Sequence, residues 1–211
     1  MDLNNNLAYL AGAIVGDGHL YKGNKSKNSP YKDYRIHIET IDKKYTSLLL
    51  DYIKTAIKTK TSVKKRIDKR TNRKIRYCVQ VRNKQLYKFL SEELKIPIGK
   101  KSGKVNIPKK ILKNKIHSKW FIAGLYDTDG GKRGHTIGFT TKSKKLIDQT
   151  SLLLNKFKIS HLKEKWINKK YNKDYYGIRL HKKSIDTFLK KFPLQNKSKK
   201  RECQSGQMGQ A

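Results

Sequence analysis

Apolar and polar positions in the first part of the chain follow two different periods. Residues 34–40 alternate with a period of two, which is typical of a strand with one buried face. Apolar residues recur at helical spacing through 45–57 and predict an amphipathic helix. Two further strands, at 63–69 and 74–82, are predicted to pair as a hairpin about a turn at 70–73. The pattern therefore mixes strands and helices within one half of the chain.

The second part of the chain repeats this order after the first copy ends with a helix at 84–94. The second copy contains a strand, a helix, the two strands of a hairpin and a last helix, at 136–141, 146–157, 162–167, 175–181 and 184–192. An apolar helix rich in small residues precedes each copy, at 9–18 and 121–130, and both end in Asp-Gly. We therefore predict an α+β fold of two pseudo-symmetric αββαββα half-domains, each with an antiparallel four-stranded sheet covered by helices on one face.

The repeat also sets the expected boundaries. The N-terminal half spans 1–97, a basic linker spans 98–117, and the C-terminal half spans 118–194. Residues 195–211 are polar and aperiodic, so we expect a disordered tail. The two Asp-Gly helices are 112 residues apart, whereas matching segments near the ends of the two copies are only 99 residues apart. The first copy must therefore contain extra residues, and we predict that they form a longer loop at 22–33.

The charge and composition of the chain favour some classes of function and exclude others. The chain has 51 Lys and Arg against 16 Asp and Glu, a formal net charge of +35, which favours a nucleic-acid partner. Two cysteines exclude a disulfide framework and a four-cysteine zinc site. No apolar run is long enough to span a membrane, and the N-terminus does not look like a secretory signal. We expect a soluble, intracellular monomer, in a prokaryotic cytoplasm or an organelle matrix.

The strands offer a nucleic-acid-binding surface because alternate residues point to opposite faces. Ile36 and Ile38, for example, point away from the polar residues between them. A solvated polar face would explain this pattern in a neutral protein, but the net charge favours DNA contact, with Arg reading guanine and Gln reading adenine. The expected DNA-binding residues are Arg35, His37, Glu39, Arg76, Gln80, Arg82, Thr140, Lys163, Lys165, Arg179 and His181.

The two Asp-Gly helices carry the candidate chemistry. Gly12 and Gly16 are four residues apart, as are Gly124 and Thr128, so each helix has a flat stripe suited to close helix packing. Packing these stripes about a pseudo-twofold axis would bring the two helix ends together. The aspartates at those ends, Asp17 and Asp129, would then lie close to each other.

Two carboxylates at helix C-termini are unfavourable as free anions, because the helix dipoles and their mutual repulsion disfavour ionisation. A divalent cation such as Mg²⁺ removes both problems and suits metal-assisted phosphodiester hydrolysis. The alternative is two ordinary helix caps, since Asp-Gly ends many helices; the duplication of the whole helix favours the metal site. Asp127 has no counterpart, since Val15 takes its place, and we expect it to be peripheral.

Residues 10–18 and 122–130 resemble the two motifs of monomeric LAGLIDADG homing endonucleases, and the resemblance extends from about residue 7 to 192. It implies motif helices at the interface of the halves and a saddle of two sheets over duplex DNA. It implies cleavage of both strands of a long, asymmetric or pseudo-palindromic target, leaving short 3′ overhangs. It further implies a free-standing enzyme encoded in a mobile intron.

By position, the resemblance implies that Asp17 and Asp129 bind Mg²⁺, or another divalent cation such as Mn²⁺. It implies that the carbonyls of Gly16 and Thr128 add ligands, and that Lys142 helps to activate water. A role for Lys142 as one more phosphate contact is equally open.

The first half lacks a lysine at the place that matches Lys142, because Ile41 and Asp42 stand there. The two strand cuts are therefore candidates for unequal rates. Two other functions remain open on the same fold: an RNA maturase that assists intron splicing by binding intron RNA, and a non-cleaving DNA-binding regulator.

Overall fold

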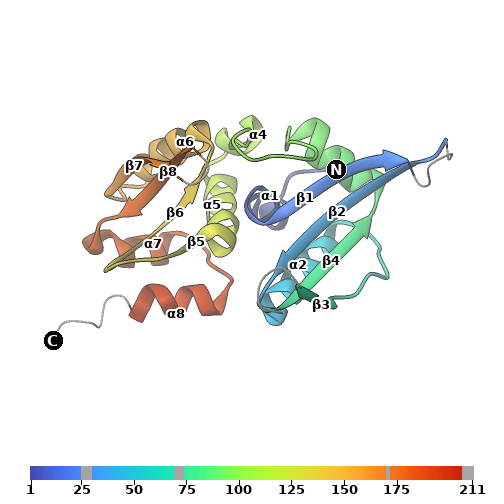
Figure 1. Ribbon diagram of the computed structural model, residues 1–211, viewed down its shortest axis with the longest axis horizontal. Helices are drawn as coiled ribbons and strands as arrows, with labels where there is room; N and C mark the ends of the chain where they lie inside the picture. Colours follow the sequence, from blue (N-terminus) through green and yellow to red (C-terminus); the bar gives the residue numbers. More distant parts are fainter. Residues whose placement is uncertain (25–29, 69–73, 170–171, 206–211) are drawn as a thin grey trace.

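Two successive copies of one α+β unit make up the protein (Figure 1). The computed structural model describes residues 1–24, 30–68, 74–169 and 172–205. Each copy has the order helix, two strands, helix, two strands and helix, so the predicted α+β architecture with two four-stranded antiparallel sheets is confirmed. Within the described residues, no helix is both long and apolar enough to cross a membrane.

The first half is built around the sheet β1-β2-β4-β3, in which all neighbours are antiparallel. Its elements are α1 (Asn5–Gly16), β1 (Gly18–Asn24), β2 (Lys32–Thr40), α2 (Lys43–Ala56), β3 (Lys64–Asp68), β4 (Lys74–Arg82) and α3 (Lys84–Lys88), which continues into a π-helical turn at Phe89–Glu93. Polar residues fix the helix starts: Asn4 caps α1 by accepting from the Leu7 amide, and Asp42 caps α2 by accepting from the Tyr45 amide.

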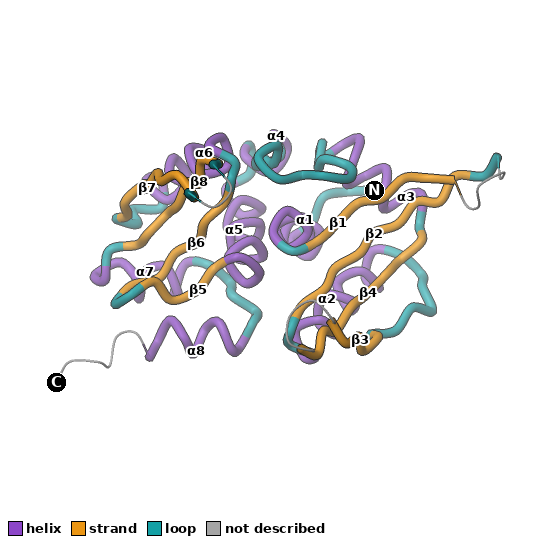
Figure 2. Tube along the Cα trace, viewed as in Figure 1, coloured by secondary structure: helices purple, strands orange, loops and turns teal. Residues whose placement is uncertain are grey.

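The second half repeats the plan with the sheet β5-β6-β8-β7. Its elements are α4 (Lys109–Leu112), α5 (Lys115–Asp129), β5 (Gly130–Arg133), β6 (Thr136–Thr141), α6 (Lys144–Lys156), β7 (His161–Asn168), β8 (Lys173–Leu180), a 3-10 turn (Lys182–Ser184), α7 (Ile185–Lys191) and α8 (Lys197–Ser205). Figure 2 shows α1 and α5 side by side at the centre of the molecule, between the two sheets.

Apolar residues on one face of each sheet form the core with the covering helices. In the first half, Ile36 and Ile38 of β2 are fully buried, as is Leu49 of α2. In the second half, Ile137 of β6 and Ile178 of β8 are buried in the same way. This inward face leaves the alternate polar positions of each sheet on the open side, as the period-two pattern predicts.

Two expected loops and the expected tail differ from the structure. Strands β1 and β2 extend into 22–33 and pair there, for instance Lys22 with Tyr34, because an edge hairpin tolerates polar residues on both faces. Residues 25–29 of this loop lie outside the described residues, as does the predicted turn at 70–73. The linker 98–117 is partly ordered, since it contains α4 and the start of α5.

The tail expected to be disordered contains α8 in its described part. Cys203 on α8 is completely buried, with its sulfur 3.3 Å from the hydroxyl of Tyr126. Asn196 is also buried and accepts hydrogen bonds from the backbone amides of Ser198 and Lys199. The segment 195–205 is therefore docked on the second half, and the expectation fails because a few specific contacts replace the missing apolar periodicity. Residues 206–211 lie outside the described residues.

Candidate active site at the seam of the two motif helices

Glycines bring the backbones of α1 and α5 into direct contact. A Cβ atom on Gly12 would collide with the carbonyl oxygen of Phe121, and one on Gly124 would collide with the carbonyl oxygen of Tyr9. Tyr9 and Phe121 are 112 residues apart, and so are the two glycines. The contacts are thus exchanged by a pseudo-twofold axis between the helices, as the small-residue stripes predict.

Asp17 and Asp129 lie at the matching ends of these helices. Asp17 is the C-cap of α1, with its amide donating to the carbonyl of Ala13, and Asp129 is the last residue of α5. A Cβ atom on Gly16 would lie 3.3 Å from the carboxyl carbon of Asp129, so that carboxyl sits against the end of the other helix. The duplication has brought the two acids into one site.

The carboxyl groups influence each other. Burial and, to a smaller extent, the nearby charge of Asp17 together raise the pKa of Asp129 to about 7. Desolvation also raises the pKa of Asp17, although its side chain is exposed and is therefore open to a ligand. Both groups are held in surroundings that favour a cation beside them.

Lys101 supplies a positive charge at this point. It comes from the segment between the halves, and its ammonium donates to the carbonyl oxygens of Ile14 (2.6 Å), Val15 (2.7 Å) and Gly16. A cation at a helix C-terminus is favourable because the last carbonyls have no partner within the helix. Burial lowers the pKa of Lys101 to about 8, while Asp129 and Asp17 act to raise it.

Lys199 on α8 approaches from the other side. Its ammonium lies 3.6 Å from the position a Cβ would take on Gly131, at the start of β5, and 3.7 Å from a carboxylate oxygen of Glu202. The charge of Lys199 lowers the pKa of both Asp17 and Asp129. Two lysines from two different segments therefore converge on the paired acids.

The sequence reasoning missed both lysines. Each stands in a lysine-rich segment without periodicity, where no pattern separates it from its neighbours. One signal was available: Lys101 and Lys199 are 98 residues apart, close to the spacing of 99 found for the last helices of the two copies. Extending the repeat past those helices would have matched Lys101 with Lys200, the neighbour of Lys199.

The donor set fits a hard divalent cation. Two carboxylates and the carbonyl of Gly16 meet here, all of them oxygen ligands, and the contact of Gly16 with an ammonium shows that the carbonyl favours positive charge. Among the described residues, no group of three or more His, Cys, Asp or Glu side chains could hold a metal. Backbone oxygens, water or a phosphate would have to complete the coordination. The hydroxyl of Thr128 donates to the carbonyls of Gly124 and Leu125.

The structure places Lys142 beside this site, directly after β6 of the second sheet. Its ammonium lies 5.1 Å from the ring centroid of Tyr175 on β8. It lines an open pocket of about 670 Å³ together with Lys101. The charges that act most on Asp129 are those of Asp17, Lys101 and Lys199. Lys101 thus binds the end of α1 directly, whereas Lys142 contacts the Tyr175 ring on β8.

Asp127 is not peripheral, contrary to expectation. Its side chain is 1% exposed, and one carboxylate oxygen accepts from Tyr9 of α1 and from the backbone amides of Gln195 and Asn196. Burial raises the pKa of Asp127 to about 6. The expectation was wrong because two of the three partners, Gln195 and Asn196, lie in a segment that was not expected to fold.

The open face of the first sheet carries the predicted polar residues. The register aligns His37 of β2 with Gln80 of β4, and Arg35 with Arg82, opposite to the buried isoleucines. Arg35 pairs with Asp33 at 2.8 Å. Polar and cationic side chains therefore cover this face.

Glu39 lies at the centre of this face. Its carboxylate oxygens are 3.4 Å from Arg66, 3.6 Å from His37 and 3.9 Å from Arg76. Glu39 thus orients donors on three strands.

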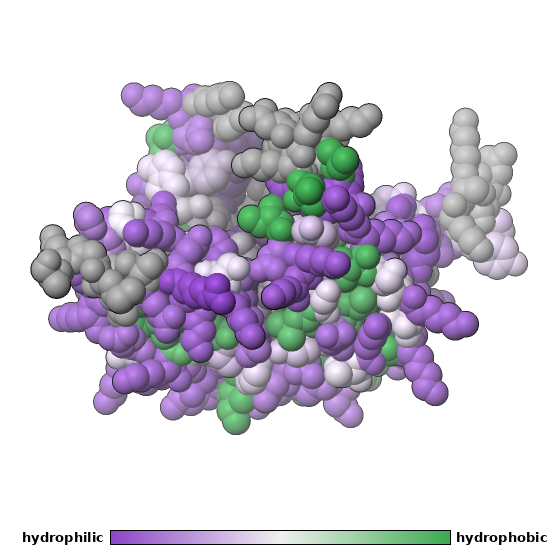
Figure 3. All heavy atoms as spheres, turned by 90° about the horizontal axis from the view of Figure 1, so that it is seen from below, coloured by the Kyte–Doolittle hydropathy of each residue, from purple (hydrophilic) through white to green (hydrophobic). Residues whose placement is uncertain are grey.

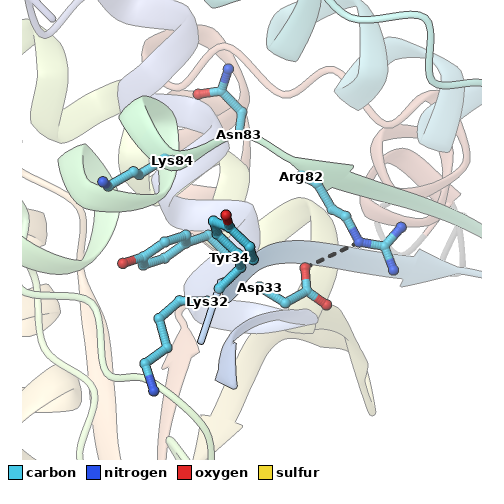
Figure 4. A pocket seen from close by; sticks show the side chains of 7 residues that line it. Lys32, Asp33, Tyr34, Arg82, Asn83 and Lys84 are labelled. Atoms are coloured by element: carbon cyan, nitrogen blue, oxygen red, sulfur yellow. Dashed lines mark hydrogen bonds and ion pairs between the residues drawn. The ribbon is translucent and has the colours of Figure 1, made fainter. Parts of the chain in front are cut away.

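A pocket of about 550 Å³ lies at the outer end of this sheet (Figure 4). Figure 4 shows Lys32, Tyr34 and Lys84 around it, with the carboxylate of Asp33 accepting a hydrogen bond from Arg82 at 3.1 Å. The cationic side chains thus continue to the end of the sheet away from the seam.

On the second sheet, the structure places only some of the expected DNA-binding residues on the open side. Arg179 and Thr140 lie on the open side, where Arg179 pairs with Glu164 at 3.0 Å. Lys163 and Lys165 lie on the opposite side, because the register aligns them with Ile178 and Tyr176 of β8.

Other contacts agree with these placements. The ammonium of Lys163 is 3.1 Å from Asp148 on α6, one of the covering helices. A shift of one residue moves a strand side chain to the other face, and the sequence did not fix this register.

His181 follows β8, with Nδ1 2.6 Å from the hydroxyl of Ser160. Seen from below in Figure 3, hydrophilic side chains cover most of the surface.

The fold can be compared with known proteins by three features: the paired motif helices, the two sheets and the acidic site that both halves share. Residues 117–193 match the family model of the LAGLIDADG-like domain. The chain therefore has the single-chain, two-domain LAGLIDADG fold that the sequence resemblance predicted.

Solved structures of this fold cover nearly the whole chain. The homing endonuclease I-DmoI in complex with DNA and Ca is 23% identical, with a TM-score of 0.68, over 94% of this chain and 97% of that one. The homing endonuclease I-WcaI, bound to its DNA recognition sequence, is 18% identical, with a TM-score of 0.64, over 96% and 88%. At these identities the likeness concerns the fold.

One protein has a higher sequence identity to this chain than these two solved structures have. The replication factor C small subunit of Methanocaldococcus jannaschii is 32% identical over 190 residues, which make up 89% of this chain. The chain spans only 9% of that protein's length, so the match concerns one part of a much larger polypeptide.

Proposed function

We propose that this chain is a site-specific double-strand DNA endonuclease that needs a divalent cation, Mg²⁺ or Mn²⁺, and leaves short 3′ overhangs. The observation that carries the proposal is the meeting of Asp17 and Asp129 at the helix seam, each at the end of the motif helix that opens one copy of a duplicated fold. The structures of I-DmoI with DNA and Ca, and of I-WcaI with its recognition sequence, support DNA as the substrate.

The residues of the seam have distinct roles in this proposal. Asp17, Asp129 and the carbonyl of Gly16 would hold the cation, which supplies charge neutralisation at the phosphate and an activated water. Lys101 and Lys199 hold positive charge at the scissile phosphates, where negative charge increases in the transition state. The close helix seam fixes the two acids relative to each other, so that neither needs to move for hydrolysis.

The open sheet faces would hold the duplex on either side of the seam. Arg35, Gln80 and Arg179 project donors from these faces, and the net charge of +35 attracts the phosphate backbone. Because the two faces carry different side chains, the target is expected to be asymmetric. One chain supplies both halves, and the protein is proposed to act as a monomer.

Cleavage of a randomised duplex library in a plasmid tests the proposal. With Mg²⁺ present, the wild-type protein should linearise a small set of related sequences, and sequencing of the ends should show short 3′ overhangs. Asp17→Asn and Asp129→Asn should abolish cleavage, while the exposed Asp51→Asn serves as the control. No cleavage of any duplex, combined with tight binding of intron RNA or with duplex binding unaffected by chelator, would replace this proposal by a maturase or a regulator.

A further inference from the structure

We propose that Asp127 is a positioning residue that docks the C-terminal segment, residues 195–205, and thereby holds Lys199 beside the paired aspartates. This inference rests on the proposed endonuclease function. It gives a role to a carboxylate that occurs in only one of the two motif helices, since Val15 stands at the matching place in the first half.

A single buried oxygen of Asp127 gathers three donors. Oδ2 accepts from the hydroxyl of Tyr9 at 2.5 Å, from the amide of Gln195 at 2.7 Å and from the amide of Asn196 at 3.1 Å. The side-chain amide of Asn196 also donates to the backbone carbonyl of Asp127 at 3.2 Å. Hydrogen bonds to a buried carboxylate are stronger than those between neutral groups, so this oxygen fixes the path of the chain.

The anchored residue leads directly to the lysine. The side-chain oxygen of Asn196 accepts from the amides of Ser198 (3.1 Å) and Lys199 (3.3 Å), and so caps the start of α8. Lys199 is thus fixed three residues after a side chain that is itself bound to Asp127. The direction in which α8 leaves this cap brings the Lys199 ammonium next to Gly131 of β5.

Apolar burial alone would not dock this helix. Residues 197–205 are Lys-Ser-Lys-Lys-Arg-Glu-Cys-Gln-Ser, and among those whose side chains are described only Cys203 is buried. The Ser198 hydroxyl also donates to Asp42 of the first half at 3.1 Å. Lys199 therefore depends on the polar anchor at Asp127 more than a lysine on an amphipathic helix would.

The first half does not need such an anchor. Val105 and Ile107 are buried in the segment that follows Lys101. Their backbone groups bind Ser143 and Gln149 of the second half. Lys101 itself makes three hydrogen bonds to carbonyls at the end of α1. The segment that carries Lys101 is held by its own contacts, which agrees with the presence of valine at position 15.

Asp127→Asn tests the inference with two independent readouts. The first is the labelling rate of Cys203 by a thiol reagent in a Cys78→Ser background, because Cys203 is covered only while α8 is docked. Loss of a charge-assisted hydrogen bond should speed this labelling by about tenfold. Asn196→Ala, which keeps the carboxylate but removes the cap, should do the same. Asp51→Asn is the matched control and should leave labelling unchanged.

The second readout is single-turnover cleavage of the library-selected duplex at saturating DNA and Mg²⁺. Asp127→Asn should slow cleavage about as much as Lys199→Met does, by about tenfold, since both take the positive charge of Lys199 away from the paired aspartates. The double variant should be no slower than Lys199→Met alone.

Each outcome decides the matter. Unchanged Cys203 labelling in both Asp127→Asn and Asn196→Ala would overturn the docking role. Faster labelling with a normal cleavage rate, or an additive loss in the double variant, would overturn the link to Lys199. If the wild-type protein cuts no duplex, the proposed function and this positioning role fail together. A cutting wild type whose Cys203 stays protected in both variants rejects the positioning role alone.

Discussion

The two halves present the same acid at the same helix end but support it with different segments. Asp17 and Asp129 occupy equivalent places about the pseudo-twofold axis, and Gly12 and Gly124 make equivalent contacts. The lysine of the first half arrives on the interdomain segment and binds three carbonyls of α1. The lysine of the second half arrives on α8, beyond the last helix of the repeat. Duplication therefore conserves the paired acids, while the supporting segments differ.

The open sheet faces differ as well. On the first sheet, Glu39 collects Arg66 and Arg76 in a polar cluster. On the second, Trp166 and Tyr175 stack with centroids 6.0 Å apart, and Arg133 lies over the Trp166 ring. Arginine side chains therefore lie against an aromatic ring on the second face, whereas on the first face they pair with a carboxylate. The comparison teaches that a near-symmetric pair of acids is combined with two unlike open sheet faces.

The largest expected effect tests the equivalence of the acids. Asp17→Asn and Asp129→Asn should each slow cleavage by at least about 1000-fold, corresponding to about 4 kcal/mol of activation free energy. The reason is that each removes one carboxylate from a shared cation site. Single-turnover cleavage of the selected duplex measures both. Full activity in either variant would mean that the two halves do not share one site.

Removing Lys101 and removing Lys199 should have unequal effects on cleavage, unlike removing either aspartate. Lys101→Met should slow cleavage by about 100-fold, since it removes a positive charge from the centre of the site. Lys199→Met should cost only about tenfold, because the Lys199 side chain is partly exposed and its charge is screened. Nicked duplex should accumulate in at least one variant when the products are resolved strand by strand. Equal losses with no nicked intermediate would contradict the asymmetry.

The helix seam should respond symmetrically. Gly12→Ala and Gly124→Ala should each lower the free energy of unfolding by about 1–3 kcal/mol or more, because the added Cβ collides with a backbone carbonyl. Urea unfolding followed by circular dichroism measures the change. Gly131→Ala is the control, since its added Cβ would meet only the flexible end of Lys199, at 3.6 Å. Tolerance of either seam variant would contradict the close packing.

The smallest effects concern the sheet faces. Arg76→Ala and Arg179→Ala should each reduce the slope of log affinity against log salt by about 0.9, because each removes one phosphate contact. Lys163→Ala should leave the slope unchanged, as that side chain pairs with Asp148 on the covering side. Fluorescence anisotropy with Ca²⁺ measures binding without cutting. A Lys163 effect equal to that of Arg179 would place both on the duplex.

Periodicity and duplication predict the fold and the paired acids, because these depend on patterns within each copy. The stripe of Gly12 and Gly16 and its counterpart predict the seam. The face of Lys163 could not be predicted, since strand register depends on tertiary pairing. Lys101 and Lys199 lie in lysine-rich segments where only the folded chain distinguishes them. The role of Asp127 depends on α8, whose docking involves one buried cysteine and a few hydrogen bonds.

The position of the bound cation tests the central claim most directly. Crystals of the protein with its selected duplex and Mn²⁺ would locate the metal by its anomalous scattering. We predict metal between the carboxylates of Asp17 and Asp129, with ligand distances of about 2.1–2.2 Å. Metal bound away from the seam, or to only one aspartate in a complex that still cuts both strands, would contradict the account.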